Sequence, residues 1–136
     1  MSEEAKDKDF AEFGSTIEEI FGKHFQRLGK DITDWNIAHW RLLMEVWKKS
    51  GTITQTEAKK AISDIKGYSS DLKQRDLIKN LRSANLLYRM DDPNDDRKKI
   101  LGISEDALPI LRAYRDEFNE AVRNRGMYLN SLDRKS

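Results

Sequence analysis

The chain has 136 residues, of which 36% are charged, and its mean hydropathy is −0.81. It contains no cysteine, which excludes disulfides, thiolate metal sites and thiol redox sensing, and its two histidines, His24 and His39, are too far apart to predict a metal site. No apolar run is long enough to span a membrane and the acidic N-terminus is unlike a secretory signal, so we expect one cytoplasmic domain that needs no cofactor.

The net charge of +1 conceals an uneven distribution along the chain. Residues 1–20 hold seven acidic and two basic side chains, a net charge of −5. Basic residues gather in the middle of the chain, at Lys59, Lys60, Lys66, Lys73, Arg75, Lys79, Arg82 and 97–99. A basic segment in a nearly neutral chain favours a nucleic-acid partner, although a solvated helix face produces the same pattern.

A long first helix is predicted over residues 10–30, after a frayed segment at 1–9. Its apolar residues recur every three or four positions, at Phe10, Phe13, Ile17, Ile20, Phe21 and Leu28. Such a stripe usually packs within its own chain, but its length and aromatic content here favour packing against a second subunit.

A second helix is predicted after Asp34 or Asn36, either of which can cap it. Ser50-Gly51 would end this helix. Its apolar face would comprise Trp40, Leu43, Val46 and Trp47.

Two further helices are predicted from their caps. Thr54 and Glu57 have the spacing of a capping box, which opens a short third helix. Ser69 or Ser70 caps a fourth helix that runs to about Ser83. The inward residues would be Ala58, Ala61, Ile62 and Ile65 on the third helix and Leu77, Ile78 and Leu81 on the fourth.

The stretch that follows the fourth helix predicts a hairpin of two strands. Asn85 suits the left-handed conformation that ends a helix, and 92–95 (Asp-Pro-Asn-Asp) is a turn cluster. Three cations, 97–99, follow at the hairpin tip, and Leu101 and Ile103 alternate as in a half-buried strand. A short capped helix, a turn, a basic helix and a hairpin together predict a winged helix-turn-helix.

The residues of this hairpin form a recognisable pattern. Asn85-Leu86-Leu87-Tyr88-Arg89, Asp92-Pro93-x-Asp95-x-Arg97 and Leu101-Gly102-Ile103-Ser104 follow one another in register. They resemble the Gly-Leu-Val-x-Arg motif, the wing signature and the Val-x-Leu-Thr motif of the MarR family of bacterial winged-helix transcription regulators. Trp40-Arg41-Leu42-Leu43 and 54–57 resemble the starts of that family's second and third helices.

The sequence also departs from the family pattern. Ala58-Lys59 stands where the family usually has Leu-Ala, and the segment 63–70 is a few residues longer than the usual turn. Gln74 falls where an apolar residue is common, and Pro109 lies early in the predicted fifth helix, where it is tolerable. These departures blur which residues would reach the bases of DNA.

The resemblance implies a mainly α fold with a small β-hairpin wing. Residues 1–136 would form a single MarR-like domain, with dimerisation helices at 10–30 and 105–132 around a winged helix-turn-helix at 35–104, whose wing is 87–103. The last helix has an apolar stripe that fits one buried face, at Leu111, Tyr114, Phe118 and Val122, followed by Tyr128 and Leu132. An intramolecular helix pair is the alternative to a dimer interface.

The function implied by the resemblance is sequence-specific binding of double-stranded DNA. The protein would be a homodimeric transcriptional repressor of a bacterial or archaeal cytoplasm, associated with the nucleoid, on a pseudo-palindromic operator with half-sites ~10 bp apart. Base edges would be reached from the first turns of the fourth helix by Ser69, Ser70, Lys73, Gln74 and Arg75. Thr54, Gln55 and Lys79 would contact phosphates, Arg97 would enter the minor groove with Lys98 nearby, and Asp95 would orient Arg97 or the turn.

A ligand site is the least constrained expectation. Family members often bind small aromatic anions in a crevice beside the DNA-binding lobe, and the candidates here are Trp35, His39, Trp40 and Tyr68. The alternative places the two tryptophans in the core and His39 at the surface or in a helix cap. A small aromatic or anionic effector would release DNA by changing the spacing of the two reading heads, and a histidine could add sensitivity to pH.

Two other classes of function are weaker. The sequence offers no convincing nucleophile and base, phosphate loop or metal cluster, so we do not expect an enzyme. A winged helix can also serve as a protein-interaction module, or in plasmid or phage maintenance without an inducer. Steep salt dependence would distinguish DNA binding from an apolar protein interface.

Overall fold

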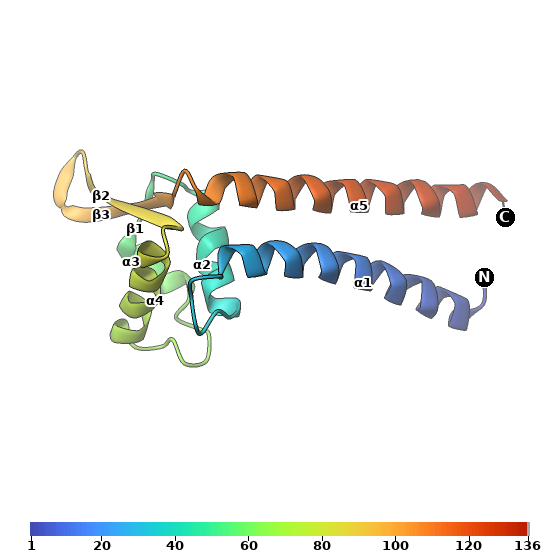
Figure 1. Ribbon diagram of the computed structural model, residues 1–136, viewed down its shortest axis with the longest axis horizontal. Coiled ribbons are helices and arrows are strands. Elements are labelled where there is room, and N and C mark those ends of the chain that lie inside the picture. The colour runs from blue at the N-terminus through green and yellow to red at the C-terminus, as the bar shows by residue number, and fades with distance from the viewer. Residues whose placement is uncertain (136) are drawn as a thin grey trace. The chain divides into compact units, whose positions relative to one another are not determined.

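The computed structural model describes residues 1–135 as helices and one small sheet. In chain order the elements are α1 (Glu3–Leu28), α2 (Ile37–Lys48), β1 (Ile53–Thr54), α3 (Gln55–Ala61), α4 (Asp71–Ser83), β2 (Leu87–Asp92), β3 (Asp95–Ile103) and α5 (Ala107–Lys135) (Figure 1). The chain divides into two compact units. We call residues 28–109 the winged unit and residues 1–27 with those from 110 onward the helical unit.

Asn36 is the residue that caps α2. Its side chain accepts a hydrogen bond from the Ala38 backbone nitrogen at 2.8 Å, and its own backbone nitrogen donates to His39 Nδ1 at 3.2 Å. These two bonds satisfy N–H groups that have no partner inside the helix. The buried face of α2 differs from the prediction, because Leu42 lies in the core while Trp40 and Trp47 are only half-buried.

The caps of α3 and α4 were predicted correctly. Thr54 Oγ1 accepts from the Glu57 backbone nitrogen at 3.1 Å, and Glu57 returns a bond to the Thr54 backbone nitrogen at 3.2 Å. Ser70 caps α4 by accepting from the Lys73 backbone nitrogen at 3.2 Å. The two helices bury one side each, which comprises Ala58, Leu77, Ile78 and Leu81.

The three strands form an antiparallel sheet in the order β1-β3-β2. The strand β3 is therefore the middle strand, and its residues 100–103 are all buried instead of alternating as predicted. Gly102 is covered by the ring of Tyr88, since a Cβ atom added to Gly102 would lie 2.2 Å from that ring. The cations 97–99 lie on β3 itself and not in the turn between the strands.

Ser104 joins the sheet to α5. Its hydroxyl donates to the carbonyl of Asn85 at 2.6 Å and accepts from the Ala107 backbone nitrogen at 3.1 Å, close to the start of α5. Asn85 has a φ of 60°, the left-handed conformation predicted for the residue that follows α4. Pro109 is the third residue of α5, where its missing N–H breaks no helical bond.

The helical unit consists of α1 and α5, which run side by side (Figure 1). The frayed segment predicted at 1–9 was wrong, because α1 begins at Glu3, where the Ser2 hydroxyl accepts from the Ala5 backbone nitrogen at 3.1 Å. Two ion pairs join the helices, Lys23 with Glu117 at 2.8 Å and Arg125 with Asp9 at 2.6 Å.

Aromatic rings fill the space around these ion pairs. The Arg125 guanidinium lies 5.3 Å from the centroid of Phe13 and 5.6 Å from that of Tyr128. Farther along, Tyr114 packs edge-on against Phe21 at 6.2 Å and against the buried His24 at 6.0 Å. The two helices therefore contact each other within one chain through rings and charges in alternation.

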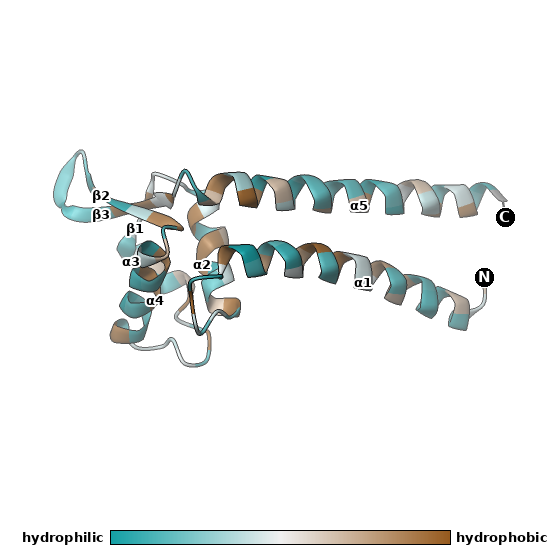
Figure 2. Ribbon diagram, viewed as in Figure 1, coloured by the Kyte–Doolittle hydropathy of each residue, from teal (hydrophilic) through white to brown (hydrophobic). Residues whose placement is uncertain are grey.

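Hydrophobic residues, brown in Figure 2, recur along both long helices, and several of them are exposed. Phe10 is 67% exposed and Met127 64%, while Val122, Tyr128 and Leu129 are each more than 40% exposed. Among residues 1–135 no helix is long and apolar enough to cross a membrane. Large exposed apolar side chains such as Phe10 and Met127 are candidates for contact with another protein surface.

Candidate nucleic-acid interface

The exposed side of α4 carries three cations, Lys73, Arg75 and Lys79. Arg75 is held by Asp71 at 2.8 Å, and the same carboxylate accepts a bond from Lys59 of α3 at 2.7 Å. The bond from Lys59 and the charge of Arg75 lower the pKa of Asp71. Asp71 therefore links the first turn of α4 to α3 and holds the Nε end of the Arg75 side chain.

The wing presents Arg97 to solvent. Its side chain is 88% exposed, and its Nε and backbone nitrogen both donate to Asp95 Oδ1 at 3.1 Å. These two bonds lower the pKa of the Asp95 carboxyl. Lys98 is exposed beside it, and Lys99 pairs with Asp91 across the two strands. Asp95 thus occupies the position from which it can orient Arg97.

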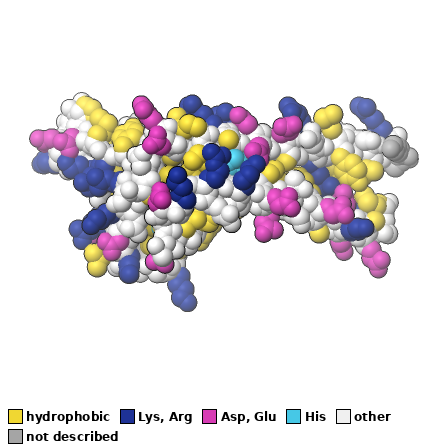
Figure 3. All heavy atoms as spheres, in the orientation of Figure 1, with side chains coloured by type: hydrophobic (Ala, Val, Ile, Leu, Met, Phe, Trp, Pro, Cys, Tyr) yellow, Lys and Arg dark blue, Asp and Glu magenta, His cyan; other side chains and the backbone are white. Residues whose placement is uncertain are grey.

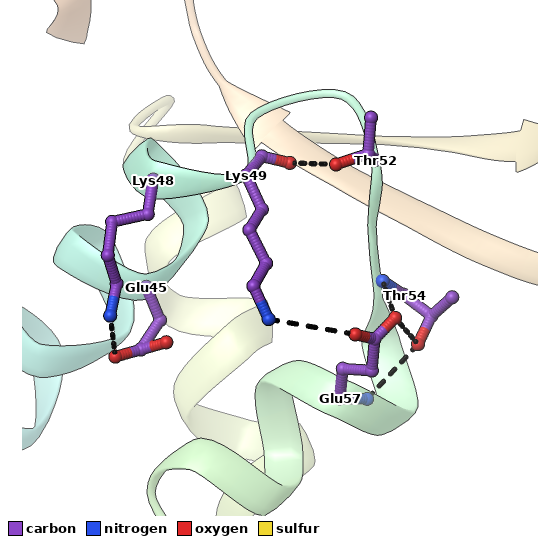
Figure 4. A network of polar contacts seen from close by, with 6 residues as sticks. All are labelled: Glu45, Lys48, Lys49, Thr52, Thr54 and Glu57. Atoms are coloured by element: carbon purple, nitrogen blue, oxygen red, sulfur yellow. Dashed lines mark hydrogen bonds and ion pairs between the residues drawn. The ribbon is translucent and has the colours of Figure 1, made fainter.

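The start of α3 and the strand β3 enclose a groove of about 490 Å³. Its lining combines the polar first turn of α3 with the cations of the wing, namely Thr54, Gln55, Thr56, Glu57, Lys59, Arg97, Lys98 and Lys99. Figure 4 shows the polar contacts at one side of this groove, where Glu57 is shared between Thr54 and Lys49. The bonds from Thr54 lower the pKa of Glu57, with a smaller contribution from the charges of Lys49 and Lys98.

One residue of this surface was not predicted. Arg89 of β2 donates through Nη1 to Gln55 Oε1 at 3.3 Å, so the wing contacts the start of α3 directly. The two residues are 34 positions apart in sequence, and no local pattern signals such a pair. Dark blue side chains of Lys and Arg gather over the wing and over α3 and α4 in Figure 3. The predicted cations Lys73, Arg75, Lys79, Arg97 and Lys98 all belong to the winged unit.

Gln74 is a correction to the predicted base-contacting residues. Its side chain lies on the inner side of α4 with only 8% of the residue exposed, and Nε2 donates to the carbonyl oxygen of Tyr68 at 2.8 Å. A buried amide that is already bonded is not available to a base edge. Ser70 is likewise engaged by its capping bond, whereas Ser69 is exposed just before the helix.

The candidate ligand-pocket residues lie near one another in the winged unit. The rings of Trp35 and His39 lie 5.0 Å apart, and Asn36 between them donates through Nδ2 to the hydroxyl of Tyr68 at 3.0 Å. Trp35 also packs on Gly29, where an added Cβ atom would lie 2.3 Å from the indole. Trp40 directly follows His39 on α2 and is half-buried.

His39 is a buried capping residue and not a surface residue. Only 1% of it is exposed, and its Nδ1 accepts the Asn36 backbone N–H. Burial lowers the pKa of His39, against smaller opposing effects of the Asn36 bond and of the Asp34 charge. Burial therefore favours the neutral form of the imidazole. Within residues 1–135 no three histidine, aspartate or glutamate side chains are grouped so as to hold a metal ion.

The fold is similar to that of several solved structures. S. aureus MepR in a complex with DNA has 20% sequence identity over 91% of this chain and 93% of its own, with a TM-score of 0.63. MepR bound to ethidium bromide has 16% identity, covers 98% and 94%, and has the same TM-score of 0.63. RV1404 from Mycobacterium tuberculosis has 12% identity over 93% and 81%, again with a TM-score of 0.63.

These likenesses are structural, since no protein-family model and no curated protein matches the amino-acid sequence. At such low identity they establish the fold. The predicted mainly α architecture with a small β-hairpin wing is confirmed, and the short strand β1 adds a third strand to its sheet. The predicted winged-helix fold is likewise the fold of MepR and RV1404. Which residues contact a partner stays a prediction.

Proposed function

We propose that this chain is a sequence-specific regulator of transcription that binds double-stranded DNA and is not an enzyme. The observation that carries the proposal is the set of exposed cations on one winged unit, with Arg97 88% exposed on the wing and Lys73, Arg75 and Lys79 exposed on α4. The solved complex of MepR with DNA, which has the same fold, supports this reading.

In the proposed complex α4 enters the major groove. Lys73 and Arg75 would reach base edges, because an arginine can donate two bonds to guanine O6 and N7. Ser69 and Ser70 would lie at the entry of the helix into the groove. Thr54, Gln55 and Lys79 would contact phosphates and set the register.

The wing would bind the minor groove beside the same site. Arg97 would insert there with Lys98 next to it, while Asp95 holds the Arg97 backbone and guanidinium. Arg89 and Lys59, which line the same face of the winged unit, join the set of proposed phosphate contacts. The groove between α3 and the wing would then follow the DNA backbone.

The proposal includes a homodimer that represses transcription. The exposed apolar side chains of the helical unit, among them Phe10, Val122 and Met127, would be covered by a second copy, alongside the pairing of α1 with α5 within each chain. Two-fold symmetry then requires a pseudo-palindromic operator. The cytoplasm of a bacterium or archaeon, close to the nucleoid, is the corresponding location.

A small effector would act on the cluster of Trp35, His39, Trp40 and Tyr68. The structure of MepR bound to ethidium bromide is compatible with an aromatic ligand on this fold. The ligand would release DNA by favouring one spacing of the two reading heads. A panel of aromatic cations and phenolic acids that leaves DNA affinity unchanged would remove the effector from the proposal.

The direct test is a titration of the protein against two duplexes at two salt concentrations. One duplex is enriched by the protein from a random pool of about 30 bp, long enough for two half-sites, and the other is its scrambled version. We expect a strong preference for the enriched duplex and a steep loss of affinity as salt rises. Equal weak binding to both duplexes, or none at low salt, would contradict the proposal and favour a protein-interaction module.

Two variants and a matched control assign the residues. Arg97→Ala should weaken binding to both duplexes and reduce the salt slope by about one phosphate contact. Arg75→Ala should in addition lower the preference for the enriched duplex by roughly 10- to 100-fold. Arg123→Ala removes an exposed arginine of α5, with the same change in net charge, and should bind like the wild type.

A further inference from the structure

A chain of hydrogen bonds links the cap of α2 to the inner side of α4. Asn36, whose side chain caps α2, donates through Nδ2 to the Tyr68 hydroxyl at 3.0 Å. The carbonyl of the same tyrosine accepts from Gln74 Nε2 at 2.8 Å. These hydrogen bonds therefore connect α2 to α4 through Tyr68, which lies in the turn between α3 and α4.

These hydrogen bonds hold the inner side of α4, opposite its exposed cations. Gln74 is only 8% exposed, so its bond to Tyr68 is shielded from competing water. On the solvent side of the same helix, directly adjacent in sequence, lie Lys73 and Arg75. A small rotation or slide of α4 that broke the Gln74 bond would also move these two side chains.

The connection between α3 and α4 explains why a tether is needed. It covers residues 62–70 and contains Gly67, which has a φ of 92°. Tyr68 donates its backbone N–H to the Ile65 carbonyl at 2.9 Å, which closes the turn, and its hydroxyl and carbonyl fix its position against α2 and α4. A connection of this length has conformational freedom that must be restrained elsewhere.

We propose that Gln74, Tyr68 and Asn36 are positioning residues that set the register of α4 for reading DNA bases. The inference rests on the proposed function and deepens it. The three residues contact no DNA themselves and act through the placement of Lys73 and Arg75. Their loss should therefore impair discrimination between sequences more than affinity for phosphates.

Tyr68→Phe and Gln74→Leu test the two links separately. Tyr68→Phe removes only the hydroxyl that Asn36 binds and leaves the Tyr68 carbonyl intact. Gln74→Leu removes the donor and keeps a side chain of similar size in the buried position. Arg123→Ala is the control, because it removes an exposed side chain of α5 and leaves Asn36, Tyr68 and Gln74 in place.

The first readout is the ratio of affinities for the enriched and the scrambled duplex. We expect the ratio to fall about tenfold in Tyr68→Phe and Gln74→Leu, while affinity for the scrambled duplex and its salt slope stay at the wild-type values. Arg123→Ala should keep the ratio within about twofold of the wild type. A parallel loss of affinity for both duplexes would point to general damage and overturn the proposal.

The second readout needs no DNA. Amide hydrogen exchange over residues 66–76 should become faster in Tyr68→Phe and Gln74→Leu and stay unchanged in Arg123→Ala. If the wild type prefers no duplex, the proposed function fails, and faster exchange in the two variants still supports the tether. Unchanged exchange together with an unchanged affinity ratio would overturn the positioning role itself.

Discussion

The winged unit and the helical unit bury their apolar side chains to different extents. In the winged unit Leu42, Leu43 and Leu101 are fully buried, and their neighbours on α2, α4 and the sheet form a continuous core. Among the described residues of the helical unit, only Leu111 belongs to the buried hydrophobic core. The other contacts between α1 and α5 join rings and charges, and Phe10 and Val122 remain exposed.

This difference indicates how each unit is stabilised. A core of aliphatic side chains supplies its own free energy of folding, roughly 1.5–3 kcal/mol for each fully buried side chain. A pair of helices held by aromatic edges and by ion pairs such as the exposed one between Lys23 and Glu117 gains much less per contact. We therefore expect the winged unit to depend on its own residues and the helical unit to depend on the second copy that we propose.

The largest effect is expected from a cavity in the core of the winged unit. Leu42→Ala removes a side chain with no solvent exposure and should lower the free energy of unfolding by about 2–5 kcal/mol, measured by urea denaturation. Leu72→Ala is the control, because Leu72 is 59% exposed on α4 and should cost less than about 0.5 kcal/mol. Equal losses in both variants would contradict a core centred on α2.

A charge in the helical unit should separate the two copies without unfolding the winged unit. Val122→Glu places a carboxylate on the exposed apolar face of α5 and should weaken dimerisation by about 2 kcal/mol, roughly 30-fold. Sedimentation measures the mass, and Val122→Leu is the apolar control. A wild type that sediments as a monomer, or a Val122→Glu variant that keeps its doubled mass, would contradict a dimer through this face.

Acid should destabilise the winged unit through His39. Burial lowers the pKa of this histidine, so the folded state favours the neutral imidazole. Stability is complete above the ordinary pKa of 6.5 and falls as pH drops below it, because the unfolded chain then binds a proton that the folded chain does not. One proton gives a slope of at most ~1.4 kcal/mol per pH unit.

His39→Gln is the variant that tests this dependence. Glutamine keeps an acceptor for the Asn36 backbone N–H at the third position of α2 and does not titrate. Thermal unfolding between pH 5 and pH 7, on either side of the ordinary histidine pKa, should lose part of its pH dependence in the variant. An unchanged dependence would assign the acid sensitivity to other groups.

The smallest expected effect comes from the cap of α3. Thr54→Ala removes the acceptor for the Glu57 backbone nitrogen and should cost about 1 kcal/mol in urea denaturation. Thr54→Ser keeps the hydroxyl and should stay close to the wild type. Thr56→Ala is an exposed neighbour in the same helix and should change stability little.

Local features of the fold were predictable from sequence, and the reasons are physical. A helix cap depends on residues within three positions, so the roles of Thr54 and Glu57 follow from spacing alone. The left-handed conformation of Asn85 and the pairing of Asp95 with Arg97 are equally local. These features could be predicted because they depend on backbone groups a few residues away and not on tertiary contacts.

Features that depend on distant contacts were not predictable in the same way. The sequence predicts Gln74 as a base-contacting residue, but in the structure its side chain lies on the inner side of α4 and donates to the Tyr68 carbonyl. His39 was expected at the surface or in a helix cap, and it is a capping residue whose burial beside Trp35 the sequence did not indicate. The pairing of Arg89 with Gln55 spans a large part of the winged unit. The contacts with DNA depend on a partner, so the sequence and the fold leave them as a proposal.

The distribution of tryptophan gives the molecule an optical asymmetry. All three tryptophans, Trp35, Trp40 and Trp47, lie in the winged unit, while the helical unit contains only phenylalanine and tyrosine rings. Tryptophan emission, excited at the red edge of the absorption band, therefore reports on the winged unit alone. Trp35, whose ring lies beside His39, reports on the surroundings of that histidine. The winged unit can thus be followed by its own emission in an unlabelled sample.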